Sequence, residues 1–264
     1  MIINGKKIAQ RILEEVKEKL QKSEKKLWLA AVLVGQNLEL KKFVELKKKA
    51  AEEIGIEFRT YEFPENVTEN QLEKELNEIA EDETVNGIII ELPLPKHLNT
   101  QCLLNTIPEK KDIDVLSKKS QDAFFAGKSK ILPPAVEAVK QIFEEYKINP
   151  KGKTAAIFGY GLLVGELVSH WLVNQGATVS IITEHVKEPE KISKETDIIV
   201  SGVGKQNLIT EDMIKDGAII IDFGKDADFE SISQKTSLIT PPVGGVGPIV
   251  VASVLKNLIE LWEI

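Results

Sequence analysis

The apolar positions of the chain follow two periodicities that alternate along it. Between residues 8 and 20 an aliphatic residue recurs every four positions, which predicts an amphipathic helix, and the unbroken apolar run over 27–34 is typical of a buried strand. The same alternation then predicts helices over 40–54, after Thr68 and over 135–146, and strands over 57–63 and 87–92. Helices alternating with buried strands predict an α/β domain with a mainly parallel sheet.

A second domain is predicted after the turn-forming segment Asn149–Lys153, which contains Pro150 and Gly152. Beyond it the pattern restarts, with strands expected over 154–158, 178–182, 198–201 and 218–222. A last apolar helix, expected over 248–262, should pack back onto the first domain. The 264 residues therefore predict two doubly wound α/β domains, residues 1–148 with 248–264 and residues 149–247.

Composition and charge exclude several classes of partner. The chain has 34 Lys and Arg against 41 Asp and Glu, a net charge of −7, and its lysines are dispersed, so no basic surface for nucleic acid is expected. Cys102 is the single cysteine and no Cys/His spacing suits zinc, which suggests a reducing cytoplasm and no metal. No apolar run approaches the ~20 residues that a membrane helix needs. A cytoplasmic protein without a membrane partner is expected.

A glycine turn follows the predicted strand over 154–158 and precedes a helix. Gly159, Gly161 and Gly165, with Tyr160 and Val164 between them, would present backbone N–H groups and a helix N-terminus to a pyrophosphate. The third glycine comes one residue later than in the usual dinucleotide motif, so a tight turn without a ligand is the alternative. The context of strand, turn and helix favours a Rossmann-type dinucleotide-binding domain.

Glu184 lies 23 residues after Gly161, just beyond the next predicted strand. An acid there would bind a ribose diol and repel a 2′-phosphate, which favours NAD over NADP. Both arginines of the chain, Arg11 and Arg59, are in the first domain, although Lys187 could supply a point charge. The alternative for Glu184 is a solvated loop acid.

Lys47 interrupts the apolar stripe of the helix predicted over 40–54, which also includes Phe43. A partly buried lysine can take part in proton transfer, and the alternative is a lysine at the edge of the core. Glu91 ends a predicted parallel strand, at the edge where α/β proteins bind ligands. The loop Lys111–Asp114 supplies further carboxylates, or is a solvated charge cluster.

Several of these segments resemble motifs of one family when they are taken together. The similar segments are Val34–Asn37 with Phe43–Lys49, Glu91–His97, Lys111–Asp114, Val203–Lys205, Ile214–Gly224 and Thr240–Pro248. They resemble the methylenetetrahydrofolate dehydrogenase/methenyltetrahydrofolate cyclohydrolase family of folate one-carbon metabolism. In this sequence Phe43 replaces the family's tyrosine, Glu91 its glutamine and Val115 a glycine, and Gly159–Gly161 replaces a Gly-Arg-Ser motif.

The resemblance implies that the enzyme oxidises 5,10-methylenetetrahydrofolate with NAD or NADP and acts as a homodimer. It assigns catalysis to Lys47, Glu91 and Asp114, and substrate binding to Phe43, Lys47, Asp114, Gly244, Gly245 and Pro248. Together with the glycine turn and the acid after the next strand, the expected cofactor-binding residues are Gly159, Tyr160, Gly161, Val164, Gly165, Glu184, Val203 and Gly204. Hydrolysis of the methenyl product is expected to be weakened, because Glu91 would hold Lys47 in its ammonium form. The alternatives are a non-catalytic relative that binds folate or nucleotide, and a dehydrogenase of the same fold acting on another small substrate.

Overall fold

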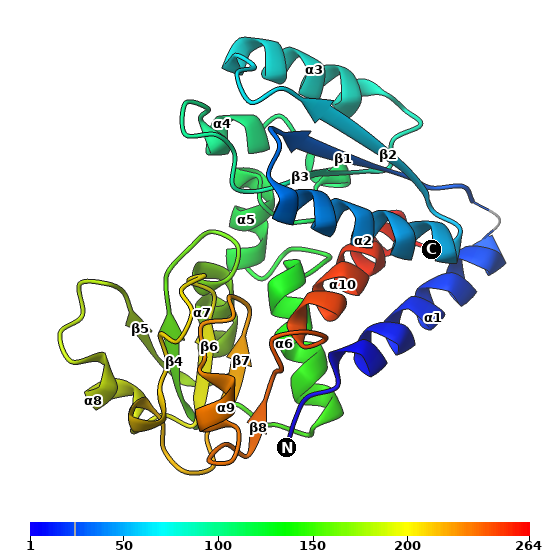
Figure 1. The fold of residues 1–264 in the computed structure, drawn as a ribbon. Coiled ribbons are helices and arrows are strands. Elements are labelled where there is room, and N and C mark those ends of the chain that lie inside the picture. The colour runs from blue at the N-terminus through cyan, green and yellow to red at the C-terminus, as the bar shows by residue number, and fades with distance from the viewer. Residues whose placement is uncertain (24) are drawn as a thin grey trace. The chain divides into compact units, whose positions relative to one another are not determined.

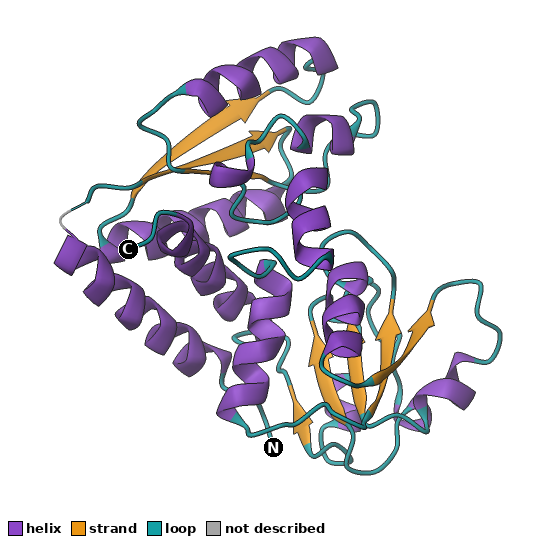
Figure 2. Cartoon of the chain, turned by 180° about the vertical axis from the view of Figure 1, so that it is seen from behind, coloured by secondary structure: helices purple, strands orange, loops and turns teal. Residues whose placement is uncertain are grey.

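The computed structural model describes residues 1–23 and 25–264, which divide into two compact units (Figures 1 and 2). The first unit comprises residues 10–134 and 251–264, and the second comprises residues 1–9 and 135–250. The division falls inside the helices α1 (Gly5–Ser23) and α10 (Val246–Leu261). The domain bounds expected from the sequence, residues 1–148 with 248–264 and residues 149–247, stay a prediction.

The first unit is built on a three-stranded parallel sheet in the order β2-β1-β3. Its strands are β1 (Trp28–Val34), β2 (Glu57–Phe63) and β3 (Gly87–Ile90). The connecting helices α2 (Leu38–Ile54) and α3 (Glu69–Glu81) lie on opposite faces of this sheet (Figures 1 and 2). Asn37 and the capping box of Thr68 and Gln71 fix where these two helices begin. Crossover connections between parallel strands are right-handed. The chain moves from β1 to β2 through α2 and then back past β1 to β3 through α3, so the two helices cover opposite faces.

The C-terminal segment completes the core of the first unit. The Asn257 amide nitrogen donates to the carbonyl oxygens of Ile113 and Leu132, both at 2.8 Å. The Trp262 indole nitrogen donates to the Asn86 carbonyl oxygen at 2.7 Å. The end of α10 therefore packs beside β3 and the loop after η1 (Glu109–Lys111). The unit also contains α4 (Thr100–Leu104) and α5 (Lys118–Phe125).

The second unit contains a five-stranded parallel sheet in the order β5-β4-β6-β7-β8. Its strands are β4 (Thr154–Phe158), β5 (Thr178–Ile182), β6 (Ile198–Ser201), β7 (Ile219–Asp222) and β8 (Leu238–Ile239). Its helices are α6 (Pro134–Glu145, from Ala135 onward), α7 (Gly165–Asn174), α8 (Pro189–Ser193), η2 (Glu211–Met213) and α9 (Phe229–Ile232). The chain runs from β4 to β5 on one side and then to β6 on the other side of β4, as in a Rossmann-type fold. The loops after β4 and β6 therefore lie next to each other at the carboxyl ends of the strands, where proteins of this class bind ligands.

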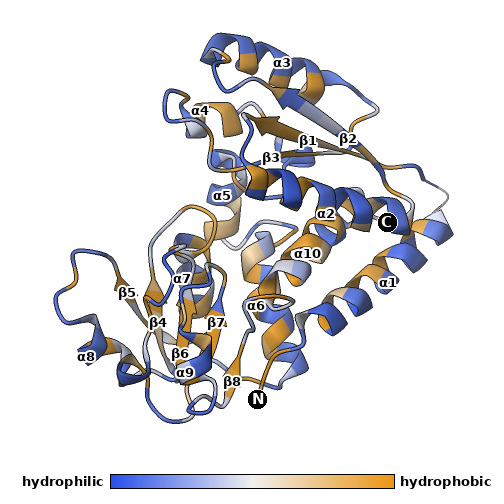
Figure 3. Ribbon diagram, in the orientation of Figure 1, coloured by the Kyte–Doolittle hydropathy of each residue, from blue (hydrophilic) through white to orange (hydrophobic). Residues whose placement is uncertain are grey.

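The N-terminus also belongs to the second unit. Ile2 pairs with Ile239, and the Ile3 backbone N–H donates to the Ile239 carbonyl oxygen at 2.8 Å. Apolar residues are concentrated in the central strands of both sheets, β1, β6 and β7, as Figure 3 shows. In the part of the chain that is described, no helix is both long and apolar enough to cross a membrane.

The predicted α/β class with two parallel sheets is confirmed, and most strand bounds agree within a residue or two. The last helix begins at Val246 rather than Pro248. A proline is tolerated in the first turn of a helix, because the backbone N–H groups of that turn have no carbonyl partner within the helix and the proline's missing N–H costs nothing there. Strand β3 ends at Ile90, so Glu91 is the first residue beyond it. The elements α4, α5, α8, α9 and β8 were not predicted, because segments of two to eight residues show little periodicity.

Candidate active site

The predicted catalytic residues Lys47 and Glu91 form an ion pair. Lys47 lies on α2, Glu91 follows β3, and the distance from Nζ to Oε1 is 2.7 Å. Their side chains are only 12% and 5% exposed. The Glu91 backbone N–H donates to the Val32 carbonyl oxygen at 2.9 Å, so the sheet itself fixes the carboxylate. A charge-assisted hydrogen bond with so little water around it is strong and holds both groups in one geometry.

Asp114, the third predicted catalytic residue, lies in the same electrostatic environment. Burial raises the pKa of its carboxyl to about 7, against the opposing effect of Lys47 and with the help of the Glu91 and Asp112 carboxylates. By surface area the residue is partly exposed, but its carboxyl is surrounded by protein on most sides. The fold therefore brings Lys47, Glu91 and Asp114 together from three separate segments of the first unit.

The other charged residues of the Lys111–Asp114 loop support it. The buried Lys111 ammonium donates to the carbonyl oxygens of Ala80 and Asp82, at 2.8 and 2.7 Å, and so caps the end of α3. Asp112 accepts hydrogen bonds from two backbone N–H groups further along the loop, those of Leu116 and Ser117. These two residues are structural, and they hold Asp114 in place.

Val115, where the family has glycine, keeps the left-handed backbone that a glycine adopts easily. Its φ is 58°, and its side chain is 1% exposed. A β-branched residue rarely adopts this conformation, at a cost of about 1–3 kcal/mol. Burial of the valine side chain offsets part of that cost.

Phe43 lies one helical turn before Lys47 on α2 but is not a core residue. The sequence placed it on the apolar stripe, whereas it is 47% exposed and the buried residues of α2 are Leu40, Val44, Ala51 and Ile54. An apolar residue at the edge of a stripe can point past the sheet, which accounts for this exposure. An exposed aromatic ring four residues from Lys47 is available to a flat ligand, and its role in substrate binding stays a prediction.

The glycine turn of the second unit has the geometry of a pyrophosphate site. Gly159 follows β4 with φ 82°, and a Cβ at Gly165, where α7 begins, would lie 2.2 Å from the Gly159 carbonyl oxygen. A Cβ at Gly161 would have no atom within 4 Å, so open space lies above the turn. Val164 caps α7 without a side-chain hydrogen bond, which leaves backbone N–H groups for an anion. Tyr160, at the rim of the turn, is half-exposed.

The predicted cofactor residue Val203 lies against this turn, and the predicted cofactor residue Gly204 follows it in the same loop. A Cβ at Gly159 would be 3.0 Å from Val203 Cγ2, and a Cβ at Gly202 would be 3.0 Å from Val164 Cβ. Gly204 has φ 79°. The loops after β4 and β6 are thus in direct contact, and glycines allow their close approach.

Glu184 lies two residues beyond β5, and its side chain is 84% exposed, with Oε1 3.7 Å from His185 Nε2. Because β5 and β4 are parallel neighbours, Glu184 and the glycine turn lie at the same edge of the sheet. The carboxylate is exposed to solvent, and its role in binding a ribose stays a prediction.

Two of the three glycines of the Thr240–Pro248 segment, Gly244 and Gly245, are required by the chain's own conformation and packing, whereas a Cβ at Gly247 would meet no atom within 4 Å. A Cβ at Gly5 would lie 1.7 Å from the Gly245 carbonyl oxygen, and a Cβ at Gly245 would lie 2.4 Å from that of Pro241. Gly244 has φ 78°. The sequence attributed these glycines to close contact with a ligand, whereas the contacts described here are with the chain itself. Roles for Gly244, Gly245 and Pro248 in substrate binding stay predictions.

Asp226 is a buried carboxylate that sequence reasoning missed. It follows the turn after β7, is 0% exposed, and accepts hydrogen bonds from Ser201, Val203 and Lys205. An aspartate that directly follows a glycine turn at the carboxyl end of a strand is the signal that could have identified it.

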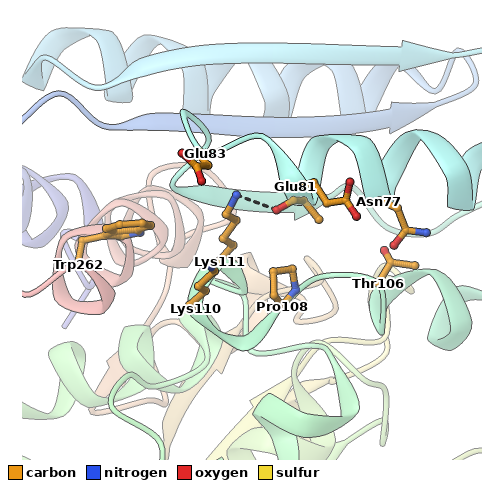
Figure 4. A pocket seen from close by; sticks show the side chains of 9 residues that line it. Asn77, Glu81, Glu83, Thr106, Pro108, Lys110, Lys111 and Trp262 are labelled. Atoms are coloured by element: carbon orange, nitrogen blue, oxygen red, sulfur yellow. Dashed lines mark hydrogen bonds between the residues drawn. The ribbon is translucent and has the colours of Figure 1, made fainter.

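A pocket of about 590 Å³ in the first unit contains none of the predicted site residues (Figure 4). It lies between α3, η1 and Trp262, and its lining residues include Asn77, Glu81, Glu83, Thr106, Pro108, Lys110 and Lys111. Lys111 is already used to cap α3. Over residues 1–23 and 25–264, no group of His, Cys, Asp and Glu side chains is arranged to hold a metal ion.

Comparisons with known proteins agree with this arrangement. Residues 3–114 match the family model described as tetrahydrofolate dehydrogenase/cyclohydrolase, catalytic domain, and residues 133–264 match the model of the NAD(P)-binding domain of the same family. The bifunctional protein FolD of Nautilia profundicola is 37% identical over 272 residues, covering 98% of this chain and 96% of that protein.

Two solved structures have the same fold over the full chain. The FolD methylenetetrahydrofolate dehydrogenase/cyclohydrolase of Campylobacter jejuni superposes with a TM-score of 0.94 at 35% identity, covering 100% of this chain and 98% of that one. The Trypanosoma brucei enzyme, solved with NADP and an inhibitor, has a TM-score of 0.95 at 28% identity, covering 100% and 97%. These likenesses disfavour a dehydrogenase of another small substrate and confirm the predicted class of enzyme. The matches of residues 3–114 and 133–264 to the two family models, with 37% identity to a relative over 98% of the chain, show that the chain belongs to the tetrahydrofolate dehydrogenase/cyclohydrolase family.

Proposed function

We propose that the chain oxidises 5,10-methylenetetrahydrofolate to the 5,10-methenyl form with NAD(P) and hydrolyses that product to 10-formyltetrahydrofolate. The observation that carries the proposal is the buried Lys47–Glu91 pair at 2.7 Å, with Asp114 in the same electrostatic environment. This cluster lies in the unit built on the β2-β1-β3 sheet, and the glycine turn lies in the other unit. We further propose that residues 1–148 with 248–264 bind folate and that residues 149–247 bind the dinucleotide.

The oxidation depends on the positions of the two ligands more than on a protein base. The lone pair of a substrate nitrogen expels the hydride as the methenyl cation forms, and bound NAD(P) supplies the hydride acceptor. Gly159, Gly161 and Gly165 would hold the pyrophosphate, because the turn combines free N–H groups with open space above Gly161. The Asp114 carboxylate can accept hydrogen bonds from the amino and ring N–H groups of a pterin, which orients the substrate.

The hydrolysis needs proton transfer, and Lys47 and Glu91 are placed to provide it. Water adds to the methenyl carbon and one of its protons is released. The other proton passes to the ring nitrogen N5 as the bond from the carbon to N5 breaks and the formyl C=O forms. In the ion pair Lys47 Nζ donates to Glu91 Oε1 at 2.7 Å, so a carboxylate competes with water for this nitrogen. We therefore propose that hydrolysis is slower, relative to oxidation, than it would be with a neutral amide at position 91 and a tyrosine at position 43.

We also propose that NAD binds more tightly than NADP. The exposed Glu184 carboxylate favours a ribose diol over a 2′-phosphate, and both arginines of the chain lie outside the second unit. A titration with each nucleotide measures the two dissociation constants, and tighter NADP binding would contradict this proposal.

A homodimer is the proposed assembly. The edge strand β5 exposes Ile181, and the preceding helix α7 exposes Val173, so this edge of the second sheet has an uncovered apolar border. Sedimentation equilibrium tests the proposal, and a monomer at micromolar concentration would contradict it.

The decisive experiment is a spectrophotometric assay with methylenetetrahydrofolate and each nucleotide. Reduction of the nucleotide, followed by decay of the methenyl absorbance, is the expected result. Lys47→Ala should abolish the decay. Binding of both ligands without turnover would instead identify a non-catalytic relative.

A further inference from the structure

The Asp226 carboxylate has a role that the proposed reaction does not use. It is 0% exposed, and its Oδ2 accepts from Ser201 Oγ at 2.5 Å and from the Val203 backbone N–H at 2.8 Å. Its Oδ1 accepts from the Lys205 backbone N–H at 2.6 Å. A buried charge is costly unless hydrogen bonds compensate for it, and here three donors converge on one carboxylate. All of these donors lie at the end of β6 or in the loop after it.

That loop is the one that packs on the glycine turn. Val203 Cγ2 lies 3.0 Å from where a Cβ at Gly159 would be, and Val164 Cβ lies 3.0 Å from where a Cβ at Gly202 would be. A shift of a few tenths of an ångström in the loop would therefore reach both ends of the turn. The position of the loop decides the shape of the surface that faces a pyrophosphate.

The turn that carries Asp226 is itself fixed by the neighbouring loops. The Asp222 carboxylate accepts from the backbone N–H groups of Gly224 and Ala227, at 2.8 and 2.9 Å. The Asp222 backbone N–H donates to Thr240 Oγ1 at 2.8 Å. A Cβ at Gly224 would lie 2.7 Å from the Gly204 backbone nitrogen, so the turns after β6 and β7 touch. Hydrogen bonds thus connect the loops after β6, β7 and β8.

We propose that Asp226 is a positioning residue for the dinucleotide, because its carboxylate holds the loop of residues 202–205 against the glycine turn. The inference rests on the proposed binding of NAD(P) by the second unit. Both carboxylate oxygens are needed, since an asparagine offers one acceptor oxygen and turns an NH₂ group toward the Val203 or the Lys205 N–H. Asp226 touches neither substrate nor cofactor in this role, and it acts through the backbone of the loop.

The test compares the full-length wild type with Asp226→Asn, Ser201→Ala and the control Asp228→Asn, which makes the same charge change two residues away. Dissociation constants for NAD and NADP are measured by titration, and steady-state kinetics give kcat and both KM values. Asp226→Asn should raise the dissociation constant of the preferred nucleotide about tenfold, which corresponds to one charge-assisted hydrogen bond lost. Its kcat at saturating nucleotide and its KM for methylenetetrahydrofolate should stay near the wild-type values. Ser201→Ala should weaken binding by about three-fold, and the control should match the wild type.

Two results would overturn the inference. One is wild-type nucleotide affinity in a folded Asp226→Asn variant. The other is an equal loss of nucleotide and folate affinity together with a lower melting temperature, which would indicate a structural role alone. If Asp226→Asn does not fold, unchanged affinity in Ser201→Ala refutes the inference, and weakened affinity supports it. A wild-type chain that binds neither nucleotide would refute the proposed function itself, and with it this inference.

Discussion

Replacement of Asp114 by asparagine should raise the free energy of unfolding of the protein. The difference between the variant and the wild type should increase as the pH rises. The pKa of this carboxyl is raised from 3.8 to about 7 in the folded chain, first by burial and then by the Glu91 and Asp112 carboxylates. A raised pKa means that the folded state favours the protonated form. The stability that this form contributes is complete below about pH 4, and it is lost as the pH rises through the folded pKa near 7. Asparagine resembles the protonated acid and does not titrate.

The magnitude follows from the size of the shift. Three pKa units at about 1.36 kcal/mol each correspond to about 4 kcal/mol when the carboxyl is ionised in both states. Between about pH 4.5 and about pH 8.5, the advantage of Asp114→Asn over the wild type should therefore increase by about 3 kcal/mol. This is an upper limit, because Asp114 is partly exposed and solvent reduces the cost of its charge.

Urea unfolding of both proteins at each pH, followed by circular dichroism, measures this difference. The difference between the two free energies of unfolding removes the contribution of every other group that titrates in the same way in both proteins. Lys47→Met is the matched control, because the Lys47 ammonium lowers the pKa of Asp114 and its removal should shift the transition to higher pH. A stability difference between wild type and Asp114→Asn that stays constant over this range would refute the reasoning.

Four further outcomes are expected. The KM for methylenetetrahydrofolate should fall as the pH rises through about 7 in the wild type and stay constant in Asp114→Asn, because only the carboxylate accepts both pterin hydrogen bonds; parallel profiles in initial-rate assays would contradict this. Glu91→Gln combined with Phe43→Tyr should raise the hydrolysis rate at least tenfold and change the oxidation rate less than three-fold, and equal changes in both assays would disprove the assignment. Glu184→Ala should narrow the difference between the NAD and NADP dissociation constants by about tenfold, and a ratio unchanged in titrations would remove Glu184 from the site. Asn257→Ala should lower the free energy of unfolding by about 3 kcal/mol in urea, because two buried carbonyl oxygens lose their donor, whereas a cost below about 1 kcal/mol would mean that water replaces it.

The sequence alone identified the class of fold, most strands and the main candidates for catalysis. Buried parallel strands are continuous apolar runs, so strands such as 154–158 and 198–201 were predicted at their observed bounds. Lys47 and Glu91 were conspicuous because each is a charge within an apolar context, and the glycine turn because glycines follow a strand and precede a helix. These signals are local, and a single segment contains them.

The tertiary structure decided what local patterns do not encode. The contact between Lys47 and Glu91 joins residues 44 positions apart, and it depends on β3 pairing beside β1. The perturbed carboxyl of Asp114 depends on burial among side chains from other segments, and the exposure of Phe43 depends on where α2 crosses the sheet. Asp226 follows a glycine turn at the end of a strand, but its importance comes from three donors that only the pairing of β6 with β7 brings to it. Propensity is a property of a segment, whereas burial, pairing and the electrostatic field of a site are sums over the whole fold.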